Sequence, residues 1–153
     1  MMKLKYTILF LFLFAFLCPT AASAQAKSMK LTFNHAAICV RDLKTSTNFY
    51  KTTLGLEEIP NPFNDGAHTW LTIGPGLQLH IIQRACDITH NKNVHLCFSV
   101  ASLSDFTSQL DKAKVAYTNL AGDSKVPTQR IDGVKQIYLQ DPDGYWLEIN
   151  DAK

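Results

Sequence analysis

The sequence lacks an apolar run long enough to cross a lipid bilayer. Its run ILFLFLFAFL (Ile8–Leu17) has ten residues, whereas a membrane-spanning helix needs about 20. Lys3 and Lys5 precede this run, and Ala22-Ser23-Ala24 follows it. A basic start, a short apolar stretch and small residues are typical of a secretory signal peptide. We therefore predict a signal peptide over residues 1–24 and an exported chain, periplasmic or secreted, without stable membrane insertion.

A surplus of charge is also absent from the predicted mature chain. The sequence has 15 lysine and arginine and 13 aspartate and glutamate residues. Cleavage after Ala24 would remove two of the basic residues, Lys3 and Lys5, and no acidic one, which leaves 13 of each. Proteins that bind nucleic acid need a clustered basic surplus. Nucleic acid is therefore excluded as an expected partner.

Cysteine is too sparse for a disulfide framework. The predicted mature chain keeps three cysteines, Cys39, Cys86 and Cys97, so at most one bridge can form within it. Cys39 and Cys97 fall on strands expected to run in opposite directions, which places them too far apart to bridge. We expect them to be buried free thiols. The full sequence has 46% hydrophobic residues, enough for the core of one ordinary domain.

The sequence contains an internal repeat. HAAICVRDL (His35–Leu43) resembles HLCFSVASL (His95–Leu103), and GLQLHI (Gly76–Ile81) resembles GYWLEI (Gly144–Ile149). The first pair reads as a strand followed by a helix that begins after Asp42 or Ser102. Each half then reads as strand, helix and three strands, where the other strands are expected at Leu56–Pro60, His68–Ile73, Ala116–Leu120 and Val134–Gln140.

Alternation divides the strand residues between two faces. One face is apolar and suited to pack under the helices: Ile38, Val40, Leu79, Ile81, Leu96, Phe98, Leu147 and Ile149. The other carries His35, Cys39, Gln78, His80, His95, Cys97, Trp146 and Glu148. The repeat pairs His35 with His95 and His80 with Glu148. Three imidazoles and one carboxylate suit a divalent metal ion such as Zn, Ni, Mn or Fe.

The segments DPDGYWLEI (Asp141–Ile149) and NFYKTTLGLE (Asn48–Glu57), with a histidine opening each half, resemble the vicinal oxygen chelate superfamily. This superfamily contains glyoxalases, bleomycin-resistance proteins and dioxygenases. The resemblance implies an α+β fold of paired βαβββ modules that form a curled eight-stranded mixed sheet with helices on its outer face. It predicts a single domain over residues 25–153, with module one at about 30–90 and module two at about 91–153.

The resemblance also implies a function. It assigns His35, His80, His95 and Glu148 as metal ligands, with Glu148 and His80 as candidate catalytic residues. Glu148 would act as a base, whereas His80, where glyoxalase I typically has glutamate, would be an extra ligand or an acid. The leading hypothesis is an exported metal-dependent lyase or isomerase that acts on a small oxygenated substrate. A ring-cleaving dioxygenase and a metal-free drug- or metabolite-binding protein are the alternatives.

Several further side chains are expected on the metal-facing side. Those assigned to a substrate pocket are Trp70, Tyr138, Trp146, His68 and Gln78. The aromatic residues equally suit the filling of a small barrel or a dimer contact. The sequence leaves open whether the modules close within one chain or exchange between the chains of a homodimer. Asp141–Gly144 is read as a turn without chemistry, and His90 as solvated.

Overall fold

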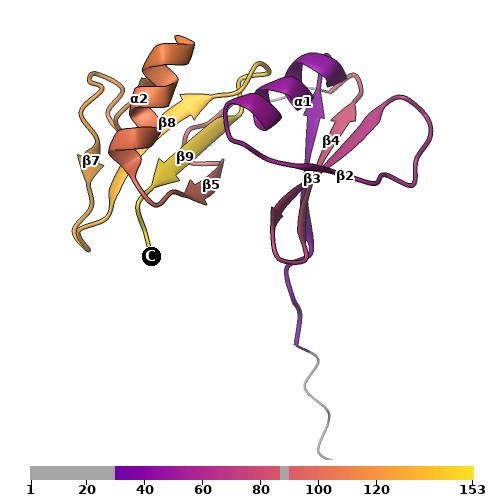
Figure 1. The fold of residues 1–153 in the computed structure, drawn as a ribbon, viewed down its shortest axis with the longest axis horizontal. Helices are drawn as coiled ribbons and strands as arrows, with labels where there is room; N and C mark the ends of the chain where they lie inside the picture. The colour runs from indigo at the N-terminus through magenta and orange to yellow at the C-terminus, as the bar shows by residue number, and fades with distance from the viewer. Residues whose placement is uncertain (1–29, 87–89) are drawn as a thin grey trace, which may run out of the picture. The chain divides into compact units, whose positions relative to one another are not determined.

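The computed structural model describes residues 30–86 and 90–153, so the predicted signal peptide lies outside the described residues. The first module consists of β1 (His35–Val40), α1 (Leu43–Thr52), β2 (Glu58–Ile59), β3 (His68–Gly74) and β4 (Leu77–Gln83). Its four-stranded sheet has the order β1-β4-β3-β2 (Figure 1). β1 is parallel to β4, and the other neighbours are antiparallel.

The second module consists of β5 (His95–Ser99), α2 (Leu103–Ala113), β6 (Tyr117–Thr118), β7 (Thr128–Gln129), β8 (Lys135–Gln140) and β9 (Trp146–Asn150). The order of its sheet is β5-β9-β8-β6, and β7 pairs with β8. β5 is parallel to β9, as β1 is to β4. The same arrangement thus occurs in both halves of the repeat.

The α+β fold of paired βαβββ modules is confirmed. The strands form two mixed sheets of four and five strands, which are not closed into a barrel, whereas the resemblance implied one curled sheet of eight. The additional strand is β7, which has only two residues. β2 and β6 are equally short but lie within predicted strands, whereas no strand was expected at the position of β7.

Both helices begin at the predicted residues. The Asp42 side chain accepts a hydrogen bond from the Thr45 amide at 2.6 Å, and the Ser102 side chain accepts one from the Asp105 amide at 3.2 Å. These bonds satisfy amide groups that the first helical turn leaves without partners. α2 ends at Ala113, and the capping residue Lys114 that follows adopts a left-handed conformation with φ of 56°.

The core lies between the helices and the predicted apolar strand face. Fully buried strand residues include Val40, Leu79, Ile81, Leu147 and Ile149. The helices add Tyr50, Leu103, Phe106 and Leu110, while Leu96 and Phe98 pack against this core and are partly buried. Because one strand face is used for the core, the face with the histidines and Glu148 is directed away from the helices.

The Asp141–Gly144 turn, between β8 and β9 of the second module, makes hydrogen bonds to the first module. Asp143 accepts hydrogen bonds from the Ser46 hydroxyl and the Arg41 amide, and Asp141 accepts one from the Tyr50 hydroxyl. Both carboxylates are buried. The turn is as predicted, and Gly144 has a φ of 93°, which glycine adopts without strain. Its side chains, to which the sequence assigns no role, tie the second module to β1 and α1 of the first.

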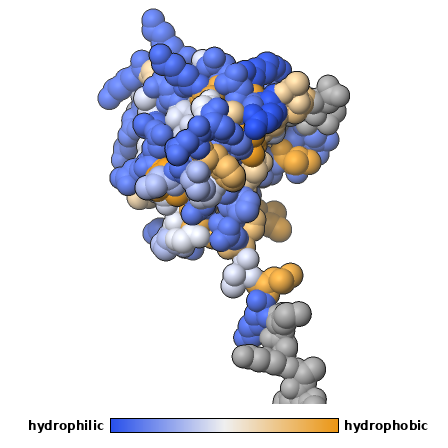
Figure 2. Space-filling view, turned by 90° about the vertical axis from the view of Figure 1, so that its right-hand side faces the viewer, coloured by the Kyte–Doolittle hydropathy of each residue, from blue (hydrophilic) through white to orange (hydrophobic). Residues whose placement is uncertain are grey.

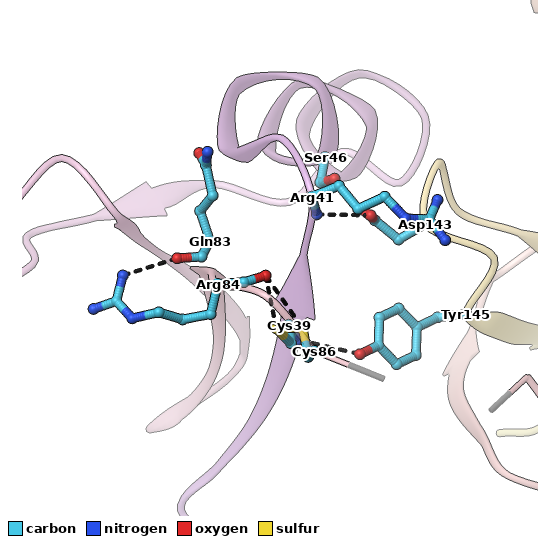
Figure 3. The surroundings of a disulfide bond; sticks show 8 residues. All are labelled: Cys39, Arg41, Ser46, Gln83, Arg84, Cys86, Asp143 and Tyr145. Carbon is cyan, nitrogen blue, oxygen red and sulfur yellow. Dashed lines mark hydrogen bonds between the residues drawn. A yellow bond between two sulfur atoms is a disulfide. The ribbon is translucent and has the colours of Figure 1, made fainter. Parts of the chain in front are cut away.

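A disulfide joins Cys39 at the end of β1 to Cys86, with their Cα atoms 6.5 Å apart (Figure 3). The expectation of a free thiol at Cys39 is therefore wrong. Cys86 follows β4, which pairs in parallel with β1, and this pairing brings the two cysteines to the same end of the sheet. The Cys39 amide also donates to the Tyr145 hydroxyl at 3.2 Å. Cys97 is a free thiol, exposed rather than buried.

Hydrophilic side chains dominate the face drawn in Figure 2, and the apolar ones form separate patches among them. Exposed large apolar residues include Phe63, Val94 and Ile131. His90 is exposed, as expected, and its ring lies edge-on to that of Tyr145. Among the residues that the structure describes, no helix has both the length and the apolar composition needed to cross a membrane.

Candidate metal centre

The first part of the candidate site is a stack of three rings on the first sheet, formed by His35 on β1, His80 on β4 and Trp70 on β3. The strand register places Trp70 opposite His80. Their ring centroids are 4.0 Å apart and their planes differ by 5°. The centroids of His80 and His35 are 4.2 Å apart and their planes differ by 13°. The His80 ring is therefore held between the other two.

Each histidine of this stack has one nitrogen engaged with an amide oxygen. His80 Nε2 lies 2.8 Å from Gln78 Oε1, and His35 Nδ1 lies 2.7 Å from Asn34 Oδ1. Because amide oxygens only accept, both nitrogens donate, and in the neutral His35 ring Nε2 keeps its lone pair. Burial lowers the pKa of His80, and the neighbouring His35 and His68 lower it further. The neutral form of His80 is therefore favoured.

His68, two residues before Trp70 on β3, has an acidic partner. Its Nδ1 is 2.8 Å from Asp65 Oδ2, and this hydrogen bond is the main cause that lowers the pKa of Asp65. The ring of Phe63 lies 4.8 Å from that of His68 and 6.0 Å from that of Trp70, between centroids. Phe63 was missed from the sequence because it lies in a loop, where no periodicity marks the direction of a side chain.

The second part of the site is centred on Glu148 of β9, which is only 6% exposed. Its Oε2 accepts a 2.5 Å hydrogen bond from the Tyr138 hydroxyl, and its Oε1 accepts a 2.9 Å bond from Asn150 and a 3.4 Å bond from Cys97. Burial by itself raises the pKa of Glu148. The three donors and the nearby His95 outweigh burial, so this pKa is lower than usual. The carboxylate is therefore ionised and firmly oriented.

His95 of β5 faces this carboxylate with its Nε2, which is 3.3 Å from Glu148 Oε2. Its Nδ1 lies 2.7 Å from the Lys92 carbonyl oxygen. A carbonyl oxygen only accepts, so Nδ1 carries a proton, and in the neutral ring Nε2 presents a lone pair. Two acceptors that face each other at this distance need a proton or a cation between or beside them. The pair has the donor atoms that a divalent transition metal prefers.

The four predicted ligands thus occur as two pairs, His35 with His80 and His95 with Glu148. Within residues 30–86 and 90–153, no three side chains of histidine, cysteine, aspartate or glutamate gather into a group that could hold a metal ion. Each module supplies one pair. The chemistry of the donors fits a divalent ion, but one chain does not bring all of them together.

Two cationic side chains, Lys92 and Arg130, border the second pair. Lys92 Nζ lies 4.5 Å from the ring centroid of Trp146 and 5.5 Å from that of Tyr138, two rings that line a hollow of about 190 Å³. Arg130 Nη1 lies 3.9 Å from Glu148 Oε1. Larger hollows, of about 420 and 620 Å³, lie beside the N-terminal ends of α1 and α2 and contain none of the predicted ligands.

The two repeated modules and their histidine and glutamate pairs define a two-module α+β protein with a candidate metal centre. The sequence profile of the Glyoxalase/Bleomycin resistance protein/Dioxygenase superfamily matches residues 32–149, and the chain belongs to this superfamily. Lactoylglutathione lyase of Pseudomonas putida is 24% identical to this chain over an alignment of 161 positions, gaps included. The alignment covers 84% of this chain and 89% of the relative.

Solved structures share the fold. A genomically encoded fosfomycin resistance protein from Listeria monocytogenes has a TM-score of 0.66 at 22% identity, covering 82% of this chain and 94% of its own. Lactoylglutathione lyase from Agrobacterium tumefaciens has a TM-score of 0.61 at 16% identity, with 82% and 96% covered. These likenesses establish the architecture of the chain.

Proposed function

We propose that the protein is a metal-dependent enzyme of the glyoxalase type, a lyase or isomerase that acts on a small oxygenated substrate. The observation that carries this proposal is the pair formed by His95 and Glu148. The Lys92 carbonyl accepts from Nδ1 of His95, so the other ring nitrogen, Nε2, faces a carboxylate oxygen of Glu148 at 3.3 Å and can bind a metal ion when it carries no proton. The lactoylglutathione lyases among the distant relatives support this class of reaction.

Glu148 is the proposed general base. Tyr138 and Asn150 each donate to a different carboxylate oxygen, which orients the group and keeps it ionised for proton uptake from the substrate. The residues predicted to hold a divalent ion (Zn, Ni, Mn or Fe) are His35, His80, His95 and Glu148, and the ion would supply Lewis acidity toward the oxygen atoms of the substrate. Trp146 and Tyr138 form an apolar wall beside this centre, suited to exclude water from it.

The centre is proposed to be completed between two copies of the chain. Each chain holds the His95–Glu148 pair in its second module and His35 in its first, in separate groups. A partner that places its second module against the histidine-bearing face of the first module would unite the two groups. Phe63 on this face is 52% exposed, so apolar surface is available for such a contact. The expected assembly is a homodimer with two equivalent centres.

Complementation between inactive variants tests this arrangement. His35→Ala and Glu148→Gln, carrying different affinity tags, are co-expressed, and the heterodimer is purified through both tags. In a shared centre, one of its two sites receives both altered residues and the other receives neither. The heterodimer should then bind one ion per two chains with wild-type affinity. If each centre lies within one chain, no heterodimer site is intact and binding stays as weak as in either variant.

The metal content of protein purified without a histidine tag separates the enzyme from its alternatives. Zinc or nickel at one ion per chain supports a lyase or isomerase. Iron at this stoichiometry favours a dioxygenase, because a site with two histidines and one carboxylate is typical of non-haem iron oxygenases. Protein that takes up no ion from any of these metals would instead be a binding protein for a drug or metabolite, and the proposed function would be wrong.

Export is proposed on two grounds. Residues 1–24 have the pattern of a secretory signal peptide. The Cys39–Cys86 disulfide supports this reading, because disulfides persist in the periplasm and outside the cell and are rare in the reducing cytosol. The two observations are independent, since one concerns the leader and the other the folded domain.

A further inference from the structure

We infer that His80 is a positioning residue that holds the imidazole of His35, and that it does not ligate the same ion as His35. The inference rests on the proposed metal centre and narrows its ligands to His35, His95 and Glu148. It replaces the ligand role that the sequence predicts for His80. The geometry of the stack formed by His35, His80 and Trp70 supports this inference.

A metal ion bound to a histidine lies close to the plane of the imidazole ring, on the lone pair of the nitrogen. Two rings that share an ion must therefore have planes that meet at the ion, about 2.0–2.1 Å from each nitrogen for zinc. The planes of His35 and His80 differ by only 13°, with their centroids 4.2 Å apart in a stacked arrangement. Planes so nearly parallel do not meet within this bonding distance. The two rings cannot bind one ion in this arrangement.

His80 is also restrained from turning toward an ion. Trp70 covers its other face, with planes 5° apart and centroids 4.0 Å apart. Its Nε2 is engaged by Gln78 Oε1 at 2.8 Å. Rotation of the ring would break this hydrogen bond and both stacking contacts. His35 has a neighbour on one face only within the stack, so His80 supplies the surface against which the His35 ring is aligned.

The consequence is a centre with two imidazoles and one carboxylate in place of four protein ligands. An octahedral ion with three protein ligands would keep three positions free, enough for two adjacent oxygen atoms of a substrate and one water molecule. A fourth protein ligand would leave two. The stack thus determines how much of the coordination sphere is available to the substrate, through a residue that holds a ligand in place.

Cobalt binding to four forms of the chain tests the inference: wild type, His80→Phe, His80→Ala and His35→Phe. Phenylalanine keeps the flat ring at residue 80 and removes both nitrogens. We expect His80→Phe to bind Co²⁺ within about threefold of wild type, with an unchanged visible absorption spectrum. His80→Ala should bind about 10–100-fold more weakly, the usual cost of losing the support of a ligand, with the same spectrum at saturation. His35→Phe should change the spectrum and lose at least as much affinity.

The intact protein provides a second measurement that does not depend on the folding of a variant. On titration with Zn²⁺, the ¹⁵N resonances of one ring nitrogen in His35 and in His95 should move by the large shift of direct coordination, while both nitrogens of His80 should stay near their starting values. A coordination shift at His80, or a spectrum altered in His80→Phe as in His35→Phe, overturns the inference and leaves the proposed function standing. Wild-type protein that binds neither ion overturns both.

Discussion

The Ser46 hydroxyl donates a 2.6 Å hydrogen bond to Asp143 Oδ2, although 97 residues separate the two in the sequence. Ser46 is 1% exposed and Asp143 is 4% exposed. The other oxygen of Asp143 accepts a 2.8 Å bond from the Arg41 amide. One carboxylate in the turn before β9 thus holds the start of α1 and the end of β1 (Figure 3). The contact between the modules depends on a few buried polar groups that satisfy one another.

Ser46→Ala should destabilise the fold, because it leaves a buried carboxylate oxygen without its hydroxyl donor. A loss of this kind costs about 1–3 kcal/mol. The free energy of unfolding in urea measures it. Ser104→Ala, at an exposed position in the first turn of α2, is the matched control and should change stability by less than about 0.5 kcal/mol. If Ser46→Ala lowers the free energy of unfolding by no more than Ser104→Ala does, the hydrogen bond between Ser46 and Asp143 contributes no stability.

Asp141→Asn should change the pH dependence of stability. Burial raises the pKa of Asp141, and hydrogen bonds, the largest of them from Tyr50, only partly oppose this rise. Protonation of a group with a raised pKa favours the folded state, a contribution that is complete below the unfolded pKa and lost as the pH rises through the folded pKa. Asparagine does not titrate. The variant should therefore be more stable relative to wild type at pH 7 than at pH 4.

Asp111→Asn is the control of opposite sign. Its hydrogen bond to Lys125 is the main cause that lowers the pKa of Asp111, so the charged form favours the folded state above the unfolded pKa. This variant should be less stable relative to wild type at pH 7 than at pH 4. Thermal unfolding in matched buffers gives both differences. A stability difference for Asp141→Asn that does not vary with pH contradicts the raised pKa.

Removal of the disulfide should destabilise the domain. Cys39 and Cys86 are 47 residues apart, and closing a loop of that length contributes about 2–4 kcal/mol by restricting the unfolded chain. The free energy of unfolding in urea should be lower by this amount in the double variant Cys39→Ser with Cys86→Ser. Thiol titration of the denatured mature chain should find one free thiol before reduction and three after it. Three free thiols in protein recovered from an oxidising compartment would rule out the bridge.

Glu148→Gln should weaken metal binding by at least tenfold, because the variant keeps the shape of the side chain and loses its negative charge. With saturating metal, turnover should fall by a further factor of about 10²–10⁴, the usual contribution of a general base. Cys97→Ser is the matched control, since serine can still donate to the same carboxylate oxygen, and its metal affinity should stay within a few-fold of wild type. Full turnover by Glu148→Gln at saturating metal would leave Glu148 as a ligand only.

Expression of the full chain in a bacterium that secretes proteins should yield a shortened product that begins at or near Gln25. The physical basis is the short apolar run, which is recognised by the export machinery and then removed. Mass spectrometry of the periplasmic fraction gives the new N-terminus. Replacing Leu11 and Leu13 with arginine should keep the chain in the cytoplasm at full length. Recovery of the uncut wild-type chain from the membrane would disprove the signal-peptide reading.

Local patterns were sufficient to predict most of the architecture. Alternation identified the buried face that carries Leu79 and Leu147, because successive side chains of a strand point to opposite sides. Asp42 and Ser102 marked the helix starts, because a short side chain that accepts from an amide acts within one turn of the helix. The internal repeat placed the four candidate ligands at equivalent strand positions. Alternation and capping depend on residues close to one another in the chain, and the repeat depends on likeness between two segments rather than on a contact between them.

The tertiary structure decided what the chain brings together across long separations. The hydroxyl groups that donate to Asp141 and Asp143 lie about 90 residues or more away in the sequence, so a segment that reads as a plain turn holds two modules together. Cys39 has its disulfide partner 47 residues on because β1 pairs in parallel with β4. The orientation of the His80 ring depends on its packing between Trp70 and His35. Residue identity shows that an imidazole can bind a metal, but the direction of its lone pair is set by the side chains packed around the ring.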